Sequence, residues 1–199
     1  MRVLRALIVH GGELAPPEIA RRAHMTPQGT RQVLGSLVKV GIVVEIGLGR
    51  YKQYQVRAVD PLLPALEALF DSEARRYKAV LDAIRTSAAS IVPPPRAVWL
   101  YGSAARGEDG VDSDVDLAVL VEVEPVERAV ERFREAVEDA TAHFGLRLSI
   151  VGLGPDDVAR LAEGDAWWNG VRRDAWTVVG PDPDTYVRQM GRRARGAKA

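Results

Sequence analysis

Hydrophobic residues in the first sixty positions recur with a helical period and then gather in two short β-rich runs. Thr26-Pro27 supplies an N-cap followed by proline at the first helical position, and Gly41 supplies a stop. The pattern therefore predicts three short helices and a β-hairpin. The expected elements are helices over 2–10, 18–23 and from Thr26-Pro27 to Gly41, then strands over 42–46 and 51–56 joined by Gly47-Leu48-Gly49-Arg50.

The remainder of the chain alternates between helical and strand patterns. An apolar stripe from Leu63 to Ile84 predicts a long linker helix, and Pro93-Pro94-Pro95 imposes an extended connector after it. The order of the elements predicts an α/β (α+β) fold, with a mixed β-sheet flanked by helices. The expected elements are strands over 97–101, across Asp114 to Val121, over 146–151 and over 176–179, with helices over 126–140 and around Trp167-Trp168.

Composition and charge narrow the class of protein. The 199 residues are 47% hydrophobic and 27% charged, and they include no cysteine, which excludes disulfides and thiolate catalysis. The apolar run 117–121 is too short to span a bilayer, and the N-terminus lacks a cleavage motif, so we expect a cytoplasmic protein without a membrane partner. The net charge of zero conceals +6 in residues 1–59, from nine basic and three acidic side chains. We therefore expect the N-terminal part to meet a polyanion.

Three short helices followed by a basic hairpin resemble a winged helix-turn-helix domain. The resemblance covers residues 1–58 and implies that the third helix enters a DNA major groove while the hairpin contacts phosphates. Protein docking or dimerisation is the alternative use of such a domain. The candidate DNA-binding residues are Gln28, Arg31, Gln32 and Lys39 on the helix and Arg50 and Lys52 on the hairpin.

The stretch from Val98 to Val121 carries the candidate chemistry. An apolar strand runs into Gly102-Ser103, and a second strand carries Asp114 and Asp116, whose spacing of two puts both carboxylates on one side. Two like charges that close together favour a hard cation such as Mg²⁺ (or Mn²⁺) between them. Because glycine permits close backbone approach, Gly102 and Ser103 are suited to a phosphate group.

Gly102-Ser103, ten further residues and Asp114-Val115-Asp116 resemble the signature of nucleotidyltransferases of the DNA polymerase β superfamily, in particular the minimal nucleotidyltransferases. The resemblance covers residues 97 to about 180. It implies that Asp114 and Asp116 are catalytic and hold the metal ions. It also implies that Gly102 and Ser103 bind the phosphates of a nucleoside triphosphate, with ATP favoured, and Arg106 is a further candidate for a phosphate contact.

One position departs from the family pattern. The resemblance places a third carboxylate on a later strand, and the position that aligns best here is Ser149. Alternation puts Leu146, Leu148 and Ile150 on one side of that strand and Arg147, Ser149 and Val151 on the other. Since a serine hydroxyl neither balances metal charge nor acts as a base near neutral pH, the motif predicts nucleotide binding better than turnover. Asp156, Asp157 and Asp165 are the alternative acids.

The sequence leaves several functions open. The first is a DNA-tethered nucleotidyltransferase, and the second is a transcriptional regulator whose degenerate transferase domain senses a nucleotide or binds a protein, including an antitoxin-like role. A homodimer through the long helix is also open.

For Trp167-Trp168, core packing is favoured over an aromatic platform for a base. The expected segments are 1–58 (winged helix-turn-helix), 59–95 (linker helix and connector), 96–185 (nucleotidyltransferase-like) and 186–199 (basic tail).

Overall fold

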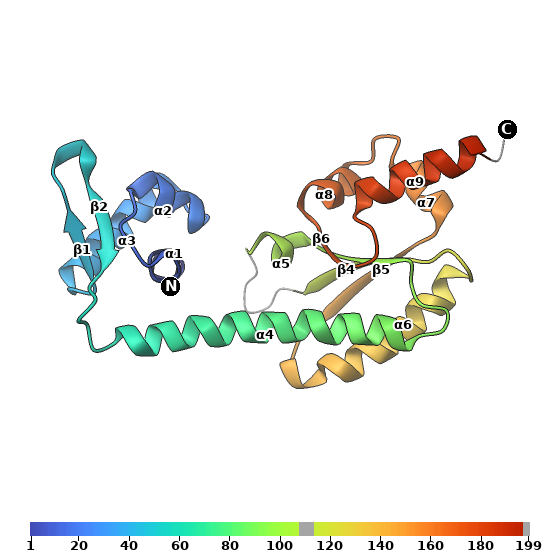
Figure 1. Cartoon of the computed structure of the whole chain (residues 1–199), viewed down its shortest axis with the longest axis horizontal. Coiled ribbons are helices and arrows are strands. Elements are labelled where there is room, and N and C mark those ends of the chain that lie inside the picture. The colour runs from blue at the N-terminus through green and yellow to red at the C-terminus, as the bar shows by residue number, and fades with distance from the viewer. Residues whose placement is uncertain (108–113, 197–199) are drawn as a thin grey trace. The chain divides into compact units, whose positions relative to one another are not determined.

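The structure is a computed structural model that describes residues 1–107 and 114–196, apart from the side chains of Arg50 and of residues 194–196 (Figure 1). The chain divides into two compact units, Met1–Arg76 and Tyr77–Ala199. The boundary falls inside helix α4 (Leu63–Ser90), which therefore contributes residues to both units. The predicted α/β (α+β) class, with a mixed sheet flanked by helices, is confirmed.

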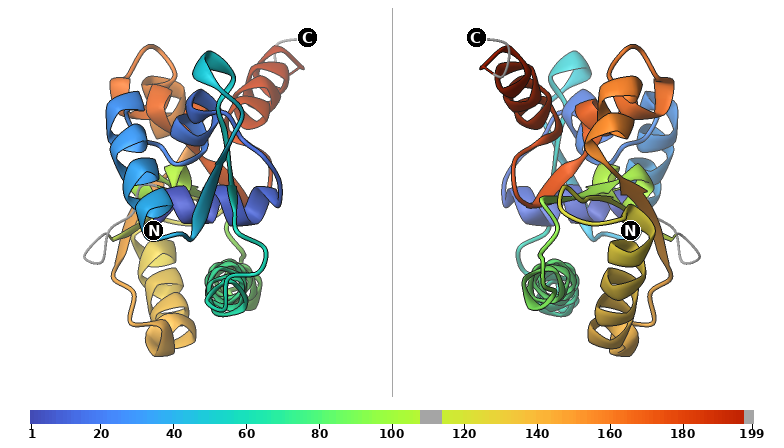
Figure 2. Two further views of the ribbon diagram at one scale, coloured as in Figure 1. Left: turned by 90° about the vertical axis from the view of Figure 1, so that its left-hand side faces the viewer. Right: turned by 90° about the vertical axis from the view of Figure 1, so that its right-hand side faces the viewer.

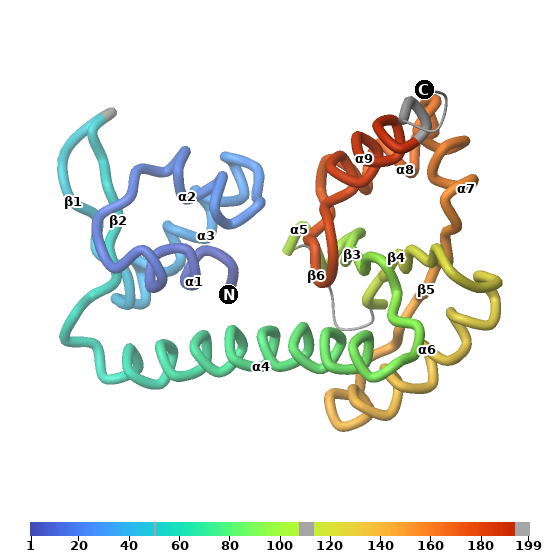
Figure 3. Tube along the Cα trace, turned by 45° about the vertical axis from the view of Figure 1, so that its right-hand side comes forward, coloured from blue at the N-terminus to red at the C-terminus, as the bar shows by residue number. Residues whose placement is uncertain are grey.

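The N-terminal unit contains three helices and a hairpin in the predicted order (Figure 3). Strands β1 and β2 pair antiparallel, and an isolated bridge joins Leu14, which lies between the first two helices, to Tyr54 in β2. The segment between α1 and α2 therefore pairs with the hairpin at strand β2. The elements are α1 (Arg2–His10), α2 (Pro16–Arg22), α3 (Pro27–Lys39), β1 (Val43–Ile46), the 3-10 turn η1 (Gly49–Tyr51) and β2 (Gln53–Val56).

The core of this unit joins all three helices to the hairpin. Leu7, Ile19, Leu34 and Val43 are each at most 1% exposed, and Phe70 of α4 packs into the same cluster. Helix α3 starts where the sequence predicts, because the hydroxyl of its N-cap Thr26 accepts a hydrogen bond from the backbone N–H of Gly29 at 3.2 Å. The side of α3 that faces away from the core is thereby fixed in orientation.

The C-terminal unit is built on a four-stranded sheet in the order β5-β4-β3-β6. Strand β4 pairs parallel with β5 and antiparallel with β3, which in turn pairs antiparallel with β6. The elements after α4 are β3 (Ala97–Tyr101), α5 (Gly102–Arg106), β4 (Val115–Leu120), α6 (Val126–Thr141), the 3-10 turn η2 (Ala142–Phe144), β5 (Leu148–Leu153), α7 (Pro155–Leu161), α8 (Ala166–Asp174), β6 (Trp176–Val179) and α9 (Pro183–Gly196).

Helices cover both faces of this sheet (Figure 2). On one face, Leu117 and Val119 of β4 pack with Ile84 of α4 and Phe133 of α6. On the other face, residues of β3 and β4 pack with α7, α8 and α9 around the fully buried Trp168. Helix α6 packs closely against β5. A Cβ atom added at Gly152 of β5 would stand 2.6 Å from Cγ1 of Val126 in α6, so only glycine leaves enough room there. Strand alternation therefore assigns each β4 side chain to one of two cores.

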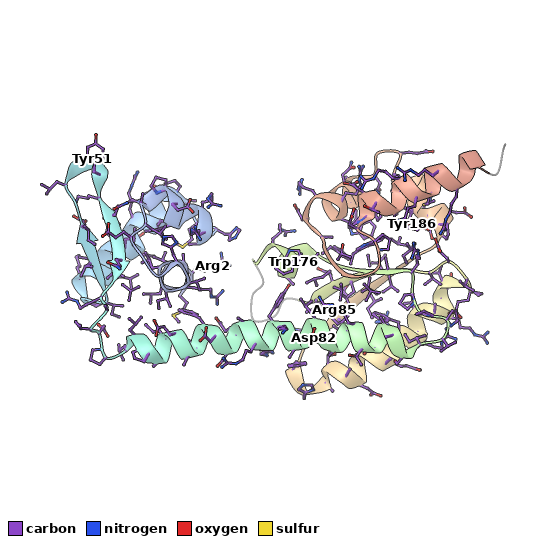
Figure 4. The ribbon with its side chains drawn as sticks, in the orientation of Figure 1. Arg2, Tyr51, Asp82, Arg85, Trp176 and Tyr186 are labelled. Carbon is purple, nitrogen blue, oxygen red and sulfur yellow. The ribbon has the colours of Figure 1, made fainter. Side chains whose placement is uncertain are left out.

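Residues 186–196 of the segment expected as a basic tail are part of helix α9, which begins at Pro183, and residues 197–199 lie outside the described residues. Tyr186 is 1% exposed and packs with Trp99, Val187 and Met190 in the core beneath this helix (Figure 4). Its hydroxyl donates a hydrogen bond to Glu122 at 3.0 Å, and burial raises the pKa of Tyr186 to about 12. Arginine residues occupy the solvent side of the helix. Because basic residues are so frequent in this segment, its apolar side is hard to recognise from the sequence.

In the part of the chain that the structure describes, none of the helices combines the length and the apolar character needed to cross a membrane.

Candidate functional site

Three side chains form a row across one end of the sheet, on the face that α8 covers. Asp116 in β4 is the register partner of Tyr101 in β3 and of Ser149 in β5. Alternation puts Asp116 on the same face as Ala118, and Tyr101 and Val151 pack into that same core. We call Tyr101, Asp116 and Ser149 the site row. Because neighbouring strands lie about 4.8 Å apart, Tyr101 and Ser149 are both immediate neighbours of Asp116.

Gly102 follows β3 directly and lies against the Asp116 carboxylate. Its φ of +75° falls in the left-handed region that glycine adopts without strain. A Cβ atom added there would overlap Oδ2 of Asp116 and would stand 3.1 Å from its Cγ atom. The bend and the carboxylate are therefore in direct contact, and a side chain at position 102 would have to displace the Asp116 carboxylate.

Asp114 lies one residue before β4 and is half exposed. Its Oδ1 atom stands 3.7 Å from Nε of Arg147, and the backbone N–H of Val115 donates to the carbonyl of Arg147 at 2.8 Å. The start of β4 is thus tied to the segment that precedes β5. Both side chains of the ion pair are largely in solvent, with exposed fractions of 72% for Arg147 and 51% for Asp114. A pair this exposed contributes little stability, so Asp114 is accessible to another cation.

Ser103 and Arg106 lie on α5, the short helix that Gly102 opens. Ser103 is partly buried in the first turn, next to the Gly102–Asp116 contact. Arg106 is exposed at the other end of α5, where it adds a small electrostatic contribution to lowering the pKa of Asp174, chiefly set by hydrogen bonding to Arg173. The structure therefore places Ser103 directly after the bend that contacts Asp116, and Arg106 near the end of α8. Residues 108–113, which complete the sequence motif, lie outside the described residues.

The alternative acids considered from the sequence have capping contacts or solvent exposure instead. Asp157 accepts a hydrogen bond from the backbone N–H of Gly154 at 3.0 Å, which, with Arg160, lowers the pKa of Asp157. Asp165 caps α8 by accepting from the N–H of Trp168 at 2.9 Å. Asp156 is exposed in the first turn of α7. Ser149 is therefore the residue that lies beside Asp116.

Sequence reasoning did not assign two residues of this region to the site, and it favoured core packing over an aromatic platform for a third, Trp167. Tyr101 and Arg147 flank the motif residues, and their proximity becomes visible only through the strand register. Trp167 stacks edge-on against Tyr101, with ring centroids 5.3 Å apart and an interplanar angle of 88°. The position of Tyr101 directly before Gly102 is the signal that could have suggested it.

The candidate DNA-binding residues lie on the N-terminal unit. Gln28, Arg31, Gln32 and Lys39 are all exposed along α3. Lys52 forms an ion pair with Glu45 at 2.6 Å, and hydrogen bonding to Glu45 raises the pKa of Lys52. The side chain of Arg50 lies outside the described residues. At the hairpin tip, Leu48 is 85% exposed and Tyr51 is 72% exposed (Figure 4).

Comparison with known proteins finds a family match for part of the C-terminal unit. Residues 87–159 match the family model described as "Polymerase beta, Nucleotidyltransferase". This match identifies a nucleotidyltransferase domain over residues 87–159. The matched residues run from the end of α4 through β5 into α7, and they include the site row, Gly102 and Asp114.

A solved structure described as "Crystal structure of the toxin-antitoxin with AMP-PNP" is similar at 15% identity, with a TM-score of 0.40, over 59% of this chain and 89% of that chain. No curated protein matches the sequence.

We predict that Gly102→Ala displaces the Asp116 side chain and destabilises the nucleotidyltransferase domain. The alanine adds the strain of a positive φ, about 1 kcal/mol, to the overlap with Asp116 Oδ2. Thermal unfolding of Gly102→Ala, Asp116→Ala and the double variant gives the coupling between the two sites. We expect a coupling of about 1–3 kcal/mol, because alanine at position 116 removes the overlapping atom.

Gly107→Ala is the matched control for this experiment. Gly107 ends the same helix with φ of +65°, but a Cβ atom there would meet no atom within 4 Å. It therefore measures backbone strain alone. Equal costs for Gly102→Ala and Gly107→Ala would show that the carboxylate does not lie against the bend.

Proposed function

We propose that this protein binds DNA through its N-terminal unit and binds a divalent cation together with a nucleoside triphosphate in its nucleotidyltransferase domain. The direct contact between Gly102 and Asp116 carries the second part of this proposal. It puts a carboxylate, a bend that tolerates no side chain and the Ser103 hydroxyl at one end of the sheet. Such a combination is suited to a polyphosphate that arrives with its metal ion.

Asp114 and Asp116 are the residues that would hold the cation. The proposal assigns these two carboxylates to the cation; among the residues that the structure describes, no group of three or more acidic, histidine or cysteine side chains could hold a metal ion. Mg²⁺ fits this donor set because it takes few protein ligands and completes its shell with phosphate oxygens and water. When bound, the ion offsets the negative charge of the phosphates. Both Asp114 and Asp116 are at least partly accessible to solvent.

The chain's own residues orient the nucleotide. Gly102 lets the backbone approach a phosphate group, and Ser103 offers a hydroxyl donor at the same place. Arg147 is close enough to Asp114 to approach the same phosphates when a cation takes its place on the carboxylate. ATP is the nucleotide that we propose to test first.

Transfer of a nucleotidyl group with release of pyrophosphate is the finer proposal. Such a transfer needs a group beside Asp116 that takes a proton from the acceptor. The residue at that place is Ser149, whose hydroxyl cannot act as a base near neutral pH. Nearby acids are committed to helix capping or exposed on α7. This observation favours a second candidate function, in which the domain senses a nucleotide, or binds a protein, and regulates the N-terminal unit.

DNA binding rests on the N-terminal unit alone. Its order of elements and the bridge from Leu14 to Tyr54 agree with a winged helix-turn-helix arrangement, in which α3 would read the major groove. Glu18 pairs with Arg21 and Arg22, and Glu45 pairs with Lys52, so these basic groups are partly neutralised. The exposed α3 residues Arg31 and Lys39 are therefore the strongest candidates for DNA contact. A homodimer would place two such helices on two half-sites.

We expect ATP with Mg²⁺ or Mn²⁺ to raise the melting temperature and Asp116→Asn to remove the shift. Ligand at about 100 times its Kd stabilises a protein by about 2.7 kcal/mol, which corresponds to about 5–10 °C for a chain of this size. Differential scanning fluorimetry with and without nucleotide measures the effect. Asp156→Asn is the control, since Asp156 is an exposed acid on α7. An unshifted melting temperature in the native protein would refute the nucleotide site.

Ser149→Asp tests whether the missing acid limits transfer. An aspartate beside Asp116 adds like-charge repulsion, so we expect a lower melting temperature without metal and a larger rise with Mn²⁺ than in the native protein. Transfer of label from α-labelled ATP should increase by about 10²- to 10⁴-fold, the usual contribution of a general base. Ser149→Ala controls for loss of the hydroxyl. No gain in transfer, with nucleotide binding intact, would favour the regulatory function.

DNA affinity should fall steeply with salt, and Arg31→Ala should weaken it. Removing one side chain that touches a phosphate makes the slope of log affinity against log salt shallower by about 1, because fewer counterions are released. Fluorescence anisotropy on duplex DNA at several salt concentrations measures both quantities. Arg21→Ala is the matched control, because Glu18 already pairs with Arg21. The absence of binding at low salt would instead favour a docking role for this unit.

A further inference from the structure

The two adjacent tryptophans of α8 have different surroundings. Trp168 is 0% exposed and stacks on Trp99 in the core beneath the sheet, with ring centroids 5.6 Å apart. Trp167 is only partly buried and lies against Tyr101 instead. Core packing therefore explains Trp168, whereas Trp167 carries its large apolar ring at the edge of the core, next to the site row.

Tyr101 connects Trp167 to Asp116. Burial is the main cause that raises the pKa of Tyr101, and the negative charge of Asp116 raises it further, while a side-chain hydrogen bond with Trp167 opposes the shift. The strand register puts Tyr101 directly opposite Asp116, and the ring contact puts it against Trp167.

The first turn of α8 fixes the position of Trp167. The Asp165 carboxylate accepts a hydrogen bond from the N–H of Trp168, and the Trp168 ring is locked in the core. The backbone of Trp167, which directly precedes Trp168, is thus held in place, and the Trp167 ring rests against Tyr101. The Trp167 ring would therefore lose little conformational entropy on contact with a ligand.

The two sides of Asp116 offer different surfaces to a ligand. On one side, β5 is the edge strand, with Ser149 and the exposed Arg147. On the other side, Tyr101 and Trp167 form a partly buried aromatic pair about one strand spacing from the carboxylate. Gly102 directly follows Tyr101 and so lies on the β3 side of Asp116 as well. Phosphates match the polar groups and the Gly102 backbone, whereas the flat, partly apolar ribose and base match the aromatic pair.

We propose that Trp167 and Tyr101 form the nucleoside-binding wall of the site and contact the ribose and base of the nucleotide whose phosphates lie at Gly102 and the carboxylates. This assignment rests on the proposed nucleotide site. It names the residues that would make the site prefer a nucleotide to a bare polyphosphate. Trp167 supplies the apolar contact, and the Tyr101 hydroxyl supplies a hydrogen bond to the sugar.

Comparison of two probes tests the wall. Binding of ATP and of inorganic tripolyphosphate, each with Mg²⁺, is measured by isothermal titration calorimetry on the full chain. Trp167→Ala should weaken ATP binding by about fivefold to a hundredfold, the range expected for loss of one stacking side chain, and should leave tripolyphosphate binding within about twofold. Tyr101→Phe should weaken ATP binding by a smaller factor, with tripolyphosphate again unchanged.

The tripolyphosphate arm separates a wall from a structural role, since a misfolded Trp167→Ala variant would lose both ligands equally. Trp176→Ala is the matched control, because Trp176 is 51% exposed on β6 and stacks on Tyr77 rather than on the site row (Figure 4). It should bind both probes as the native protein does.

Intrinsic fluorescence gives a readout independent of affinity. In a Trp176→Phe background, ATP should quench part of the tryptophan emission, and the additional change Trp167→Phe should remove that quenching, because Trp99 and Trp168 are fully buried.

The outcomes that would overturn the wall differ from those that would overturn the nucleotide site. If the native chain binds tripolyphosphate and ATP equally well, or if Trp167→Ala weakens both alike or neither, the wall is wrong while the phosphate site stands. If the native chain binds neither probe, the proposed nucleotide site and the wall fall together.

Discussion

The contact between the Gly102 backbone and the Asp116 carboxylate is the constraint around which the nucleotidyltransferase domain is organised. It requires strand β3 to end at Tyr101, a left-handed residue to turn the chain at once into α5, and β4 to run antiparallel to β3 so that Asp116 faces the turn. The two buried cores hold β3 and β4 in that register. A slip of one residue would send Asp116 to the opposite face.

Charge balance at this end of the sheet follows from the same geometry. Asp116 lies between a phenol and a serine hydroxyl, and Asp114 has Arg147 as a cationic neighbour. A third carboxylate in place of Ser149 would raise the density of negative charge and the demand for metal ions. With serine there, the proposed site has two carboxylates and one arginine for a metal–phosphate complex, and Ser149 does not act as a base near neutral pH.

The N-terminal unit distributes its charges in a different way. Several arginine and lysine residues outside α3 are paired with Glu18, Glu45 or Glu73, whereas the polar residues of α3 lie exposed beside a buried apolar side. These pairs partly neutralise basic groups outside α3, while Arg31 and Lys39 of α3 lie exposed. Helix α4 supplies Phe70 to this core and Ile84 to the core of the other unit, so the predicted linker belongs to both.

Local patterns in the sequence predicted most of the helices and strands, the position of Ser149 on its strand and a glycine bend near two carboxylates, of which Asp116 lies against Gly102. These features depend on periodicity and on residues close in the chain, so they are readable without coordinates. Only the tertiary structure decided that Tyr101, Asp116 and Ser149 form one row, that Arg147 meets Asp114, and that Trp167 rather than Trp168 lies at the site. It also drew the residues expected as a basic tail into α9, because Tyr186 buries its ring beneath that helix. Strand register and burial join residues far apart in sequence, and no local pattern records which distant partner each side chain will meet.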